Sequence, residues 1–267
     1  MTAPGHTTAG AAVAAAPADL VRMGGIVKRF GSIEALRGVD LHLAAGEVLG
    51  LVGDNAAGKS TLTKILAGVL EPDAGTTKIE GRPVRFASPA EARARRIEMV
   101  YQDLSLCDTI DVAGNLFLGR EPVRPLLGVR LLDKARMHRD ARAMLAALEI
   151  RIPNLRSLAG GLSGGQRQSI AIARAVAFEP KVLIMDEPTS ALAVAEVEAV
   201  LRLIATVRER GVGVILITHR LQDLFRVCDR IMVLYEGRNV AERRIGETDL
   251  EDLVRLIVGE RLAAGAG

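Results

Sequence analysis

Residues 47 to 60 carry the strongest structural signal in the chain: Glu47-Val-Leu-Gly-Leu-Val52, followed by Gly53-Asp54-Asn55-Ala56-Ala57-Gly58-Lys59-Ser60. The apolar run has the length and composition of a strand buried on both faces of a parallel sheet. The second part matches G-x-x-x-x-G-K-[ST], a loop whose backbone N–H groups curl around phosphate oxygens at the start of a helix. The apolar residues that follow have helical spacing, which predicts an amphipathic helix directly after the loop.

The residues of this loop have distinct expected roles toward a bound triphosphate. Lys59 would supply a positive charge to the β- and γ-phosphates, and the Ser60 hydroxyl is placed to ligate Mg²⁺. The alternative is a chance glycine-rich turn, but the preceding strand and following helix are the context that the motif requires. The predicted nucleotide contacts are Gly53, Asp54, Asn55, Ala56, Ala57, Gly58, Lys59, Ser60 and Thr61.

Two further apolar runs of strand length end in polar residues. One precedes Asp186 and Glu187, and the other, over residues 212–218, precedes His219. Apolar residues at helical spacing lie between them and predict a crossover helix, so the two strands should be parallel in one α/β sheet. Ligands bind at the carboxyl ends of the strands in such sheets.

These strand-end residues are candidates for catalysis. Asp186 is expected to hold Mg²⁺ and Glu187 to polarise an attacking water, although the pair alone would also fit a solvated helix start. His219 could hydrogen-bond a γ-phosphate and the catalytic acid, whereas a lone histidine is more often structural. Gln102 ends a predicted strand over 97–101, where its amide could touch Mg²⁺ and the attacking water. The alternative for Gln102 is an ordinary surface residue.

Composition excludes several classes of protein. The chain has 267 residues, 49% of them hydrophobic and 25% charged, with a net charge of +3. This is ordinary for a globular protein, and the small charge excess does not indicate a nucleic-acid partner. Aromatic residues make up only 3%, which argues against an aromatic platform for sugars or bases. Cys107 and Cys228 indicate reduced thiols rather than a disulfide framework, and no apolar run is long enough to predict a membrane span.

We expect one domain over residues 19–262, with a disordered tail at 1–18 and a second tail at 263–267. Residues 103–163 are expected to form a helical insertion, because they contain no buried-strand runs. Its strongest segment is a helix predicted over residues 133–148.

Two local signals complete the predicted elements. Residues 21–43 are expected to form short strands broken by Gly24-Gly25, Gly31 and Gly38. Thr248 to Glu251 has the spacing of a capping box and predicts the start of the last helix.

The stretch Leu162-Ser163-Gly164-Gly165-Gln166 precedes a predicted helix and adds a second anion-binding turn of N–H groups. With it, the chain resembles the ATP-binding cassette (ABC) ATPases over about residues 20 to 260. The resemblance implies an α/β fold: a P-loop NTPase core with a mainly parallel sheet, an N-terminal antiparallel β subdomain and a helical insertion. The motifs that carry it occur in the family's order, namely Gly53–Thr61, Gln102, Leu162–Gln166, Val182–Glu187 and His219.

The resemblance also implies roles for individual residues. Phe30 would stack on the adenine, Glu187 would be the catalytic base and His219 the γ-phosphate sensor. In the family, each ATP lies between two subunits of a head-to-tail dimer, with Mg²⁺ as the metal. The phosphate would then be held by Lys59 of one subunit and by the signature turn of the other, formed by Ser163, Gly164, Gly165 and Gln166.

Several loop patterns narrow the resemblance to carbohydrate importers of the ribose, xylose and fructose type, among them Tyr101–Leu106 and Asn115–Glu121. Two positions depart from the family. Ala56 stands where most members have glycine, which would cost about 1–2 kcal/mol if the backbone there needs a positive φ. Ala193 stands where the family usually has an aspartate that couples the two sites, so its absence bears on the hydrolysis rate.

The resemblance predicts an ATP-hydrolysing subunit that dimerises on ATP and powers import of a small solute, such as a monosaccharide. Its partners would be a second copy or a paralogous cassette, an integral membrane permease and, indirectly, an extracytoplasmic solute-binding protein, with no nucleic acid. It would lie at the cytoplasmic face of the cell membrane. The alternatives are a weakly hydrolysing ATP-dependent clamp, which Ala193 brings into consideration, and a soluble ABC ATPase outside transport.

Overall fold

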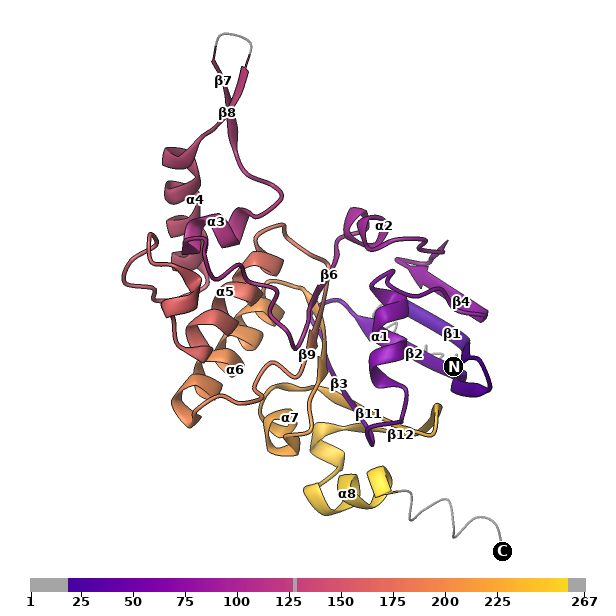
Figure 1. Cartoon of the computed structure of the whole chain (residues 1–267). Coiled ribbons are helices and arrows are strands. Elements are labelled where there is room, and N and C mark those ends of the chain that lie inside the picture. Colours follow the sequence, from indigo (N-terminus) through magenta and orange to yellow (C-terminus); the bar gives the residue numbers. More distant parts are fainter. Residues whose placement is uncertain (1–18, 127–128, 259–267) are drawn as a thin grey trace, which may run out of the picture.

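A six-stranded sheet forms the centre of the computed structural model, which describes residues 19–126 and 129–258 (Figure 1). The strand order is β12-β11-β3-β10-β9-β6, and every neighbouring pair is parallel except β11 and β12. The predicted parallel α/β core is therefore present. Its strands are β3 (Val48–Val52), β6 (Ile97–Val100), β9 (Val182–Asp186), β10 (Gly213–Ile217), β11 (Arg230–Tyr235) and β12 (Arg238–Arg244).

The three central strands are apolar because both faces of the sheet are covered. Alternate residues of β3 enter different cores: Val48 and Val52 pack on one face, Leu49 and Leu51 on the other. All four are fully buried. Each such side chain contributes about 1.5–3 kcal/mol of transfer free energy, which fixes the strand register that positions the loops at the carboxyl ends.

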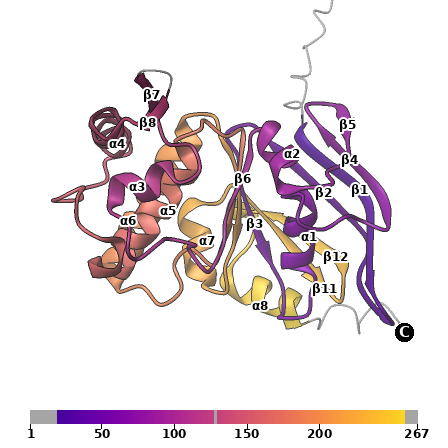
Figure 2. The ribbon, with the colours of Figure 1, turned by 45° about the horizontal axis from the view of Figure 1, so that its top comes forward.

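Helices cover the two faces unequally (Figure 2). One core contains residues of α3 to α8, and the other lies between the central sheet, α1, α2 and a second sheet. The helices of the first core are α3 (Val112–Phe117), α4 (Lys134–Ala147), α5 (Gly164–Val176), α6 (Val194–Glu209), α7 (Leu221–Val227) and α8 (Leu250–Val258). The helices of the second are α1 (Lys59–Leu66) and α2 (Pro89–Ala94).

The second sheet is antiparallel, as the family resemblance implied, and has the order β2-β1-β4-β5. Of the glycines expected to break it into short strands, Gly31 does so, in the turn between β1 and β2, whereas the others do not. Gly24 and Gly25 lie inside β1, where the register shifts between Met23 and Ile26, and Gly38 lies inside β2 with a φ of 86°. β-bulges absorb these residues, so the strands continue past them. The strands are β1 (Asp19–Phe30), β2 (Ile33–Ala44), β4 (Ala74–Ile79) and β5 (Arg82–Val84).

An insertion carries helices α3 and α4. The predicted helix over 133–148 is present as α4, and Asp133 caps it by accepting a 2.9 Å hydrogen bond from the Arg136 N–H. Between α3 and α4 the structure adds a two-stranded hairpin, β7 (Val123–Leu126) and β8 (Val129–Leu132), which projects away from the body (Figure 1). The sequence predicted a helical insertion and did not predict this hairpin, because the exposed strand β8 leaves no buried-strand pattern in the sequence.

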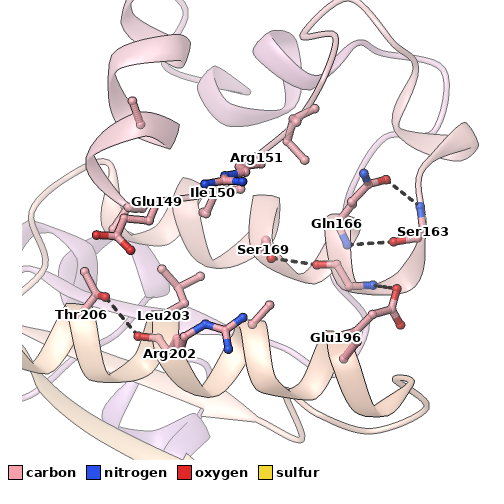
Figure 3. A pocket seen from close by; sticks show the side chains of 16 residues that line it. Glu149, Ile150, Arg151, Ser163, Gln166, Ser169, Glu196, Arg202, Leu203 and Thr206 are labelled. Carbon is pink, nitrogen blue, oxygen red and sulfur yellow. Dashed lines mark hydrogen bonds between the residues drawn. The ribbon is translucent and has the colours of Figure 1, made fainter.

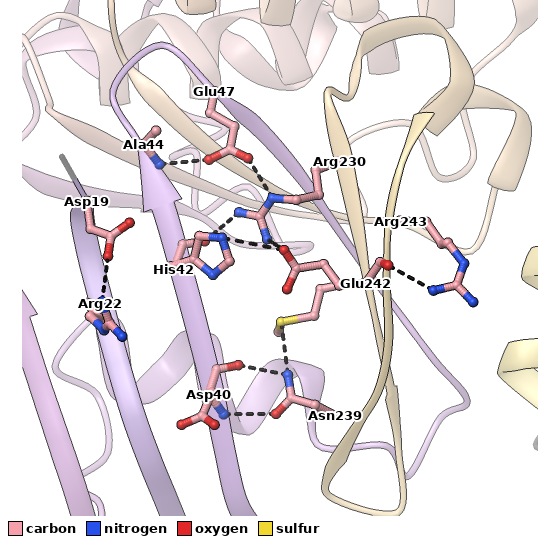
Figure 4. Close-up of polar contacts among 11 residues, drawn as sticks. Asp19, Arg22, Asp40, His42, Ala44, Glu47, Arg230, Asn239, Glu242 and Arg243 are labelled. Carbon is pink, nitrogen blue, oxygen red and sulfur yellow. Dashed lines mark hydrogen bonds and ion pairs between the residues drawn. The ribbon is translucent and has the colours of Figure 1, made fainter. Parts of the chain in front are cut away.

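A buried arginine joins the two large sheets (Figure 4). Arg230, at the start of β11, is 8% exposed. Its Nε donates to Glu47 Oε1 at 2.8 Å, and its Nη2 donates to the His42 carbonyl of β2 at 2.8 Å. A further ion pair with Glu242 of β12 completes its partners. The cluster therefore ties β2 to the amino ends of strands β3 and β11, at the end of the central sheet opposite the predicted nucleotide site.

The C-terminal helix begins one residue later than the expected capping box. The Asp252 N–H donates to Asp249 Oδ1 at 2.8 Å, so Asp249 caps α8 and Thr248 does not. Two short 3-10 turns, η1 (Ala159–Gly161) and η2 (Ile245–Glu247), complete the described elements. Of the helices in residues 19–126 and 129–258, none is both long and apolar enough to span a bilayer. The tails expected at 1–18 and 263–267 lie outside these residues.

Candidate functional site

The glycine-rich loop forms a tight connection between β3 and α1. Gly53 has a φ of 147° and Gly58 a φ of 96°, conformations that favour glycine. A Cβ at Gly53 would overlap the Leu234 carbonyl of β11. The turn after β11 supports the loop from behind, because the Gly237 N–H donates to the Ala57 carbonyl at 3.2 Å. The loop is thus held in shape by a part of the chain about 180 residues away.

Lys59, the first residue of α1, turns back across this loop. Its Nζ donates to the carbonyls of Gly53 at 2.8 Å and of Asp54 at 2.9 Å. Burial lowers the pKa of Lys59, while the charges of Glu187, Asp186 and Asp54 act in the opposite direction. The ammonium group therefore lies among the loop carbonyls and near Asp186 and Glu187 at the end of β9.

The departure at Ala56 causes no backbone strain. Ala56 is not among the described non-glycine residues that have a positive φ. The conformational cost of about 1–2 kcal/mol that the sequence raised for alanine at this position therefore does not arise. Ala57 is buried beneath the loop, whereas Asn55 and Ala56 are exposed. The loop can therefore form with alanine at position 56.

A cavity of about 490 Å³ joins the loop to the predicted adenine-stacking residue. Phe30, at the end of β1, is 47% exposed and lines this cavity, with the Lys28 ammonium 5.7 Å from its ring centroid. An exposed aromatic face of this kind can stack on a base. The predicted contacts that share the cavity are Phe30, Asn55, Ala56, Gly58, Lys59, Ser60 and Thr61, whereas Gly53, Asp54 and Ala57 do not line it.

Glu187 and His219 meet at the carboxyl edge of the central sheet. The paired strands β9 and β10 place them side by side, since Asp186 is in register with Ile217. His219 Nδ1 lies 2.7 Å from Glu187 Oε2, and the Glu187 N–H donates to the Ile217 carbonyl at 2.9 Å. Glu187 adopts a φ of 53°, a strained conformation that often accompanies functional sites.

Asp186 supplies a half-buried carboxylate at the end of β9. Burial, and then the charge of Glu187, raises the pKa of Asp186, while Lys64 and Lys59 oppose this shift. Ser60 is exposed at the start of α1. A hydroxyl and a carboxylate are hard oxygen donors of the kind that Mg²⁺ prefers, and the concentration of negative charge at Asp186 and Glu187 favours a cation there. These residues fit a magnesium ion.

Gln102 lies two residues beyond β6, next to β9 in the sheet, and is exposed. The loop that it starts is fastened to α5 by a residue that our sequence reasoning missed. Arg174 donates to the carbonyls of Leu104 at 2.8 Å and of Ser105 at 2.9 Å. An arginine inside an amphipathic helix gives no sequence signal for such a link, because its partners lie about 70 residues away.

The Ser163 turn does not share the cavity lined by the glycine-rich loop. It borders another hollow of about 810 Å³ between α5, α6 and residues 148–152 (Figure 3). Ser163 caps α5: its Oγ accepts from the Gln166 N–H at 3.3 Å, and its own N–H donates to Gln166 Oε1 at 3.1 Å. Glu196, also missed from the sequence, accepts a hydrogen bond from the Gly165 N–H at 3.0 Å. The second predicted anion site is therefore separate from the first.

With this geometry established, sequence comparison defines the family. A profile of the ABC transporter family matches residues 36–190. The chain belongs to the ABC transporter family. It is 44% identical to a fructose import ATP-binding protein of Rhizobium meliloti over 89% of this chain and 93% of the relative. It is 41% identical to a xylose/arabinose import ATP-binding protein of Sulfolobus acidocaldarius, over 90% of this chain and 94% of the relative.

Ribose importers are also among the relatives of this ABC chain. A ribose import ATP-binding protein of Chromobacterium violaceum is 44% identical over 91% of this chain but only 47% of its own length, so the chain spans about half of that relative. The resemblance to ABC ATPases of the carbohydrate-import group is confirmed by these matches.

Solved structures agree with the fold of the ABC chain. A nucleotide-free ATP-binding cassette from an ABC transporter superposes with a TM-score of 0.77 at 27% identity, covering 92% of this chain and 97% of the other. A dimeric post-hydrolysis cassette bound to ADP and Pi gives 0.70 at 26% identity, covering 84% and 98%. The predicted P-loop NTPase fold is confirmed, whereas the roles of the individual site residues stay predictions.

Proposed function

We propose that this chain is the ATP-hydrolysing subunit of a membrane importer whose solute is a monosaccharide. Its relatives are named as import ATP-binding proteins for fructose, for xylose or arabinose, and for ribose. An integral membrane permease would be its partner at the cytoplasmic face of the membrane, and an extracytoplasmic solute-binding protein would act indirectly. The solute is then recognised by those partners and not by this chain.

The contact between Glu187 and His219 is the observation that carries the hydrolytic role. Glu187 is half-buried and held at 2.7 Å from His219 Nδ1, beside the carboxyl end of β9. In this position Glu187 can accept a proton from a water that attacks the γ-phosphate, and His219 keeps the carboxylate oriented. Lys59 places its charge at the phosphates, where negative charge develops during transfer.

Ser60, Asp186 and Gln102 would hold Mg²⁺. When bound, the ion would neutralise charge on the β- and γ-phosphates. The adenine would lie against Phe30, which lines the same cavity as Ser60 and Thr61. The bound ATP would therefore extend from its adenine at the end of β1 to its triphosphate at the start of α1.

The separate position of the signature turn supports a dimer. Ser163, Gly164, Gly165 and Gln166 do not line the cavity that contains Phe30 and Ser60. A second copy, or a paralogous cassette, would bring its own signature turn to that cavity in a head-to-tail arrangement. The dimeric cassette bound to ADP and Pi, to which this chain is similar, shows that the fold forms dimers.

Replacement of the proposed base tests this function. Glu187→Gln keeps the size of the side chain but removes the proton acceptor, so we expect ATP binding with turnover reduced by about 10²-fold or more. Because the bound ATP is not hydrolysed, the ATP-bound dimer should also accumulate. Phosphate release and size-exclusion chromatography with light scattering measure the two effects.

Glu209→Gln, at the exposed end of α6, is the matched control and should hydrolyse ATP as the parent protein does. Rapid steady-state hydrolysis by Glu187→Gln would refute the assignment of the base. Very slow turnover by the parent protein, alone and with its permease, would instead indicate the ATP-dependent clamp.

A further inference from the structure

The carboxylate of Glu196 lies on the signature turn. Glu196 is in the first turn of α6, and its Oε1 accepts a 3.0 Å hydrogen bond from the Gly165 N–H at the start of α5 (Figure 3). Its Oε2 accepts a 3.1 Å bond from the Ala193 N–H. Hydrogen bonds from Gly165, Ser163 and Ala193 hold the pKa of Glu196 below its usual value, so the group is charged at neutral pH.

Close packing keeps this carboxylate in place. A Cβ on Gly165 would lie 2.7 Å from both Cβ and Cγ of Glu196, so only glycine at position 165 permits the contact. Glu196 also reaches back to Ala193, the position at which the family usually carries an aspartate. A carboxylate is thus present near Ala193. It comes from Glu196 in the first turn of α6 and points at the signature turn of the same subunit.

One group that Glu196 engages, the Gly165 N–H, is also a group that would bind a partner's nucleotide. In the proposed dimer, the Ser163 hydroxyl and the N–H groups of residues 164 and 165 face the γ-phosphate held by the other subunit. In the separate subunit, the Gly165 N–H already donates to Glu196. A carboxylate and a phosphate compete for this N–H, because it offers a single hydrogen and the two negative charges repel each other.

We propose that Glu196 occupies the signature anion site in the separate subunit, and that the γ-phosphate of a partner's ATP displaces it as the dimer closes. The inference rests on the proposed function, because it needs the dimer. The hollow of about 810 Å³ beside Glu196 gives the released carboxylate space to move. Part of the binding free energy of ATP is then used to release Glu196, which raises the ATP concentration needed for closure.

A purely structural role for Glu196 predicts the opposite result, and this makes the test decisive. If Glu196 only braces the signature turn, its removal loosens the turn and weakens closure. If it competes with the phosphate, its removal strengthens closure. The measurement is the ATP concentration that gives half-maximal dimer, followed by light scattering in a Glu187→Gln background, where hydrolysis does not deplete the nucleotide.

We expect Glu196→Gln, and more strongly Glu196→Ala, to lower this ATP concentration by on the order of tenfold. Glu198→Gln is the matched control on the same helix, since Glu198 pairs with Arg226 and not with the signature turn. An unchanged or higher ATP requirement in Glu196→Gln, with the parent melting temperature retained, overturns the inference. Absence of any ATP-induced dimer in the Glu187→Gln parent would instead overturn the proposed function, and this inference with it.

Discussion

Asp186 illustrates how a single residue can favour function over stability. Its pKa is raised by burial and by the charge of Glu187, so at neutral pH the folded state holds an unfavourable negative charge. When the pKa of an acid is higher in the folded than in the unfolded state, the acid destabilises the fold at pH values above its folded-state pKa. This destabilisation disappears as the pH falls through the folded-state pKa toward the unfolded-state value.

Asp186→Asn should therefore raise the melting temperature at neutral pH, by roughly 2–4 °C, while it abolishes magnesium-dependent ATP hydrolysis. Differential scanning calorimetry against pH measures the first effect and phosphate release the second. The gain should shrink at acidic pH, where the parent carboxyl becomes protonated. An equal gain at neutral and acidic pH would contradict this electrostatic explanation.

At the level of single residues, the sequence predicted what depends on local pattern. The loop at residues 53–60 and the strand-end residues Glu187 and His219 follow from a short motif and from apolar runs, and the structure brings Glu187 and His219 together. Glu196 and Arg174 could not be found this way, because their partners are 31 and about 70 residues distant. Only the packing of α5 against its neighbours reveals these contacts.

At the scale of elements, Arg174 fastens the loop after Gln102 to helix α5, and this link can be tested by mutation. Arg174→Ala removes both hydrogen bonds to the loop carbonyls, so movements of the loop and of the signature helix should become less coupled. We expect ATP turnover to fall by on the order of fivefold, since changes at such links alter coupling by about 0.5–2 kcal/mol. The Kd for ATP should stay unchanged, because Arg174 does not line the nucleotide cavity.

Steady-state kinetics and a fluorescent-nucleotide titration separate these two quantities. Arg174→Lys should restore turnover only in part, because an ammonium group lacks the planar fork that reaches two carbonyls. Arg139→Ala, exposed on α4, serves as the control. Equal losses in turnover and in ATP affinity would argue against a coupling role.

Elements with a buried face were predictable and exposed ones were not. Helix α4 followed from apolar residues that the structure buries, such as Met137, Ala141 and Leu145. The hairpin β7–β8 carries exposed apolar side chains on a two-stranded ribbon, so no periodic pattern marks it. Gly31 ends β1 as predicted, but the glycines inside β1 and β2 misled the prediction, because a glycine at a β-bulge and a glycine at the end of a strand give the same sequence signal.

At the scale of the molecule, Arg230 joins the two sheets around the core that contains α1. Arg230→Ala would leave Glu47 half-buried without its cation, and breaking such a pair costs about 3–5 kcal/mol in the free energy of unfolding. Urea denaturation measures this loss. Arg255→Ala, which removes an exposed pair with Glu251 on α8, should cost less than about 1 kcal/mol. Similar losses in the two variants would show that Arg230 does not join the sheets.

The turn at Gly237 has a consequence for how the protein is made. It supports the glycine-rich loop through Ala57, and the family profile ends at residue 190, well before it. A growing chain on the ribosome thus exposes every residue of the loop long before the segment that props it up has been synthesised. The loop gains this support only after residue 237 has been synthesised, so we expect its nucleotide-binding shape to form well after the loop itself has been made.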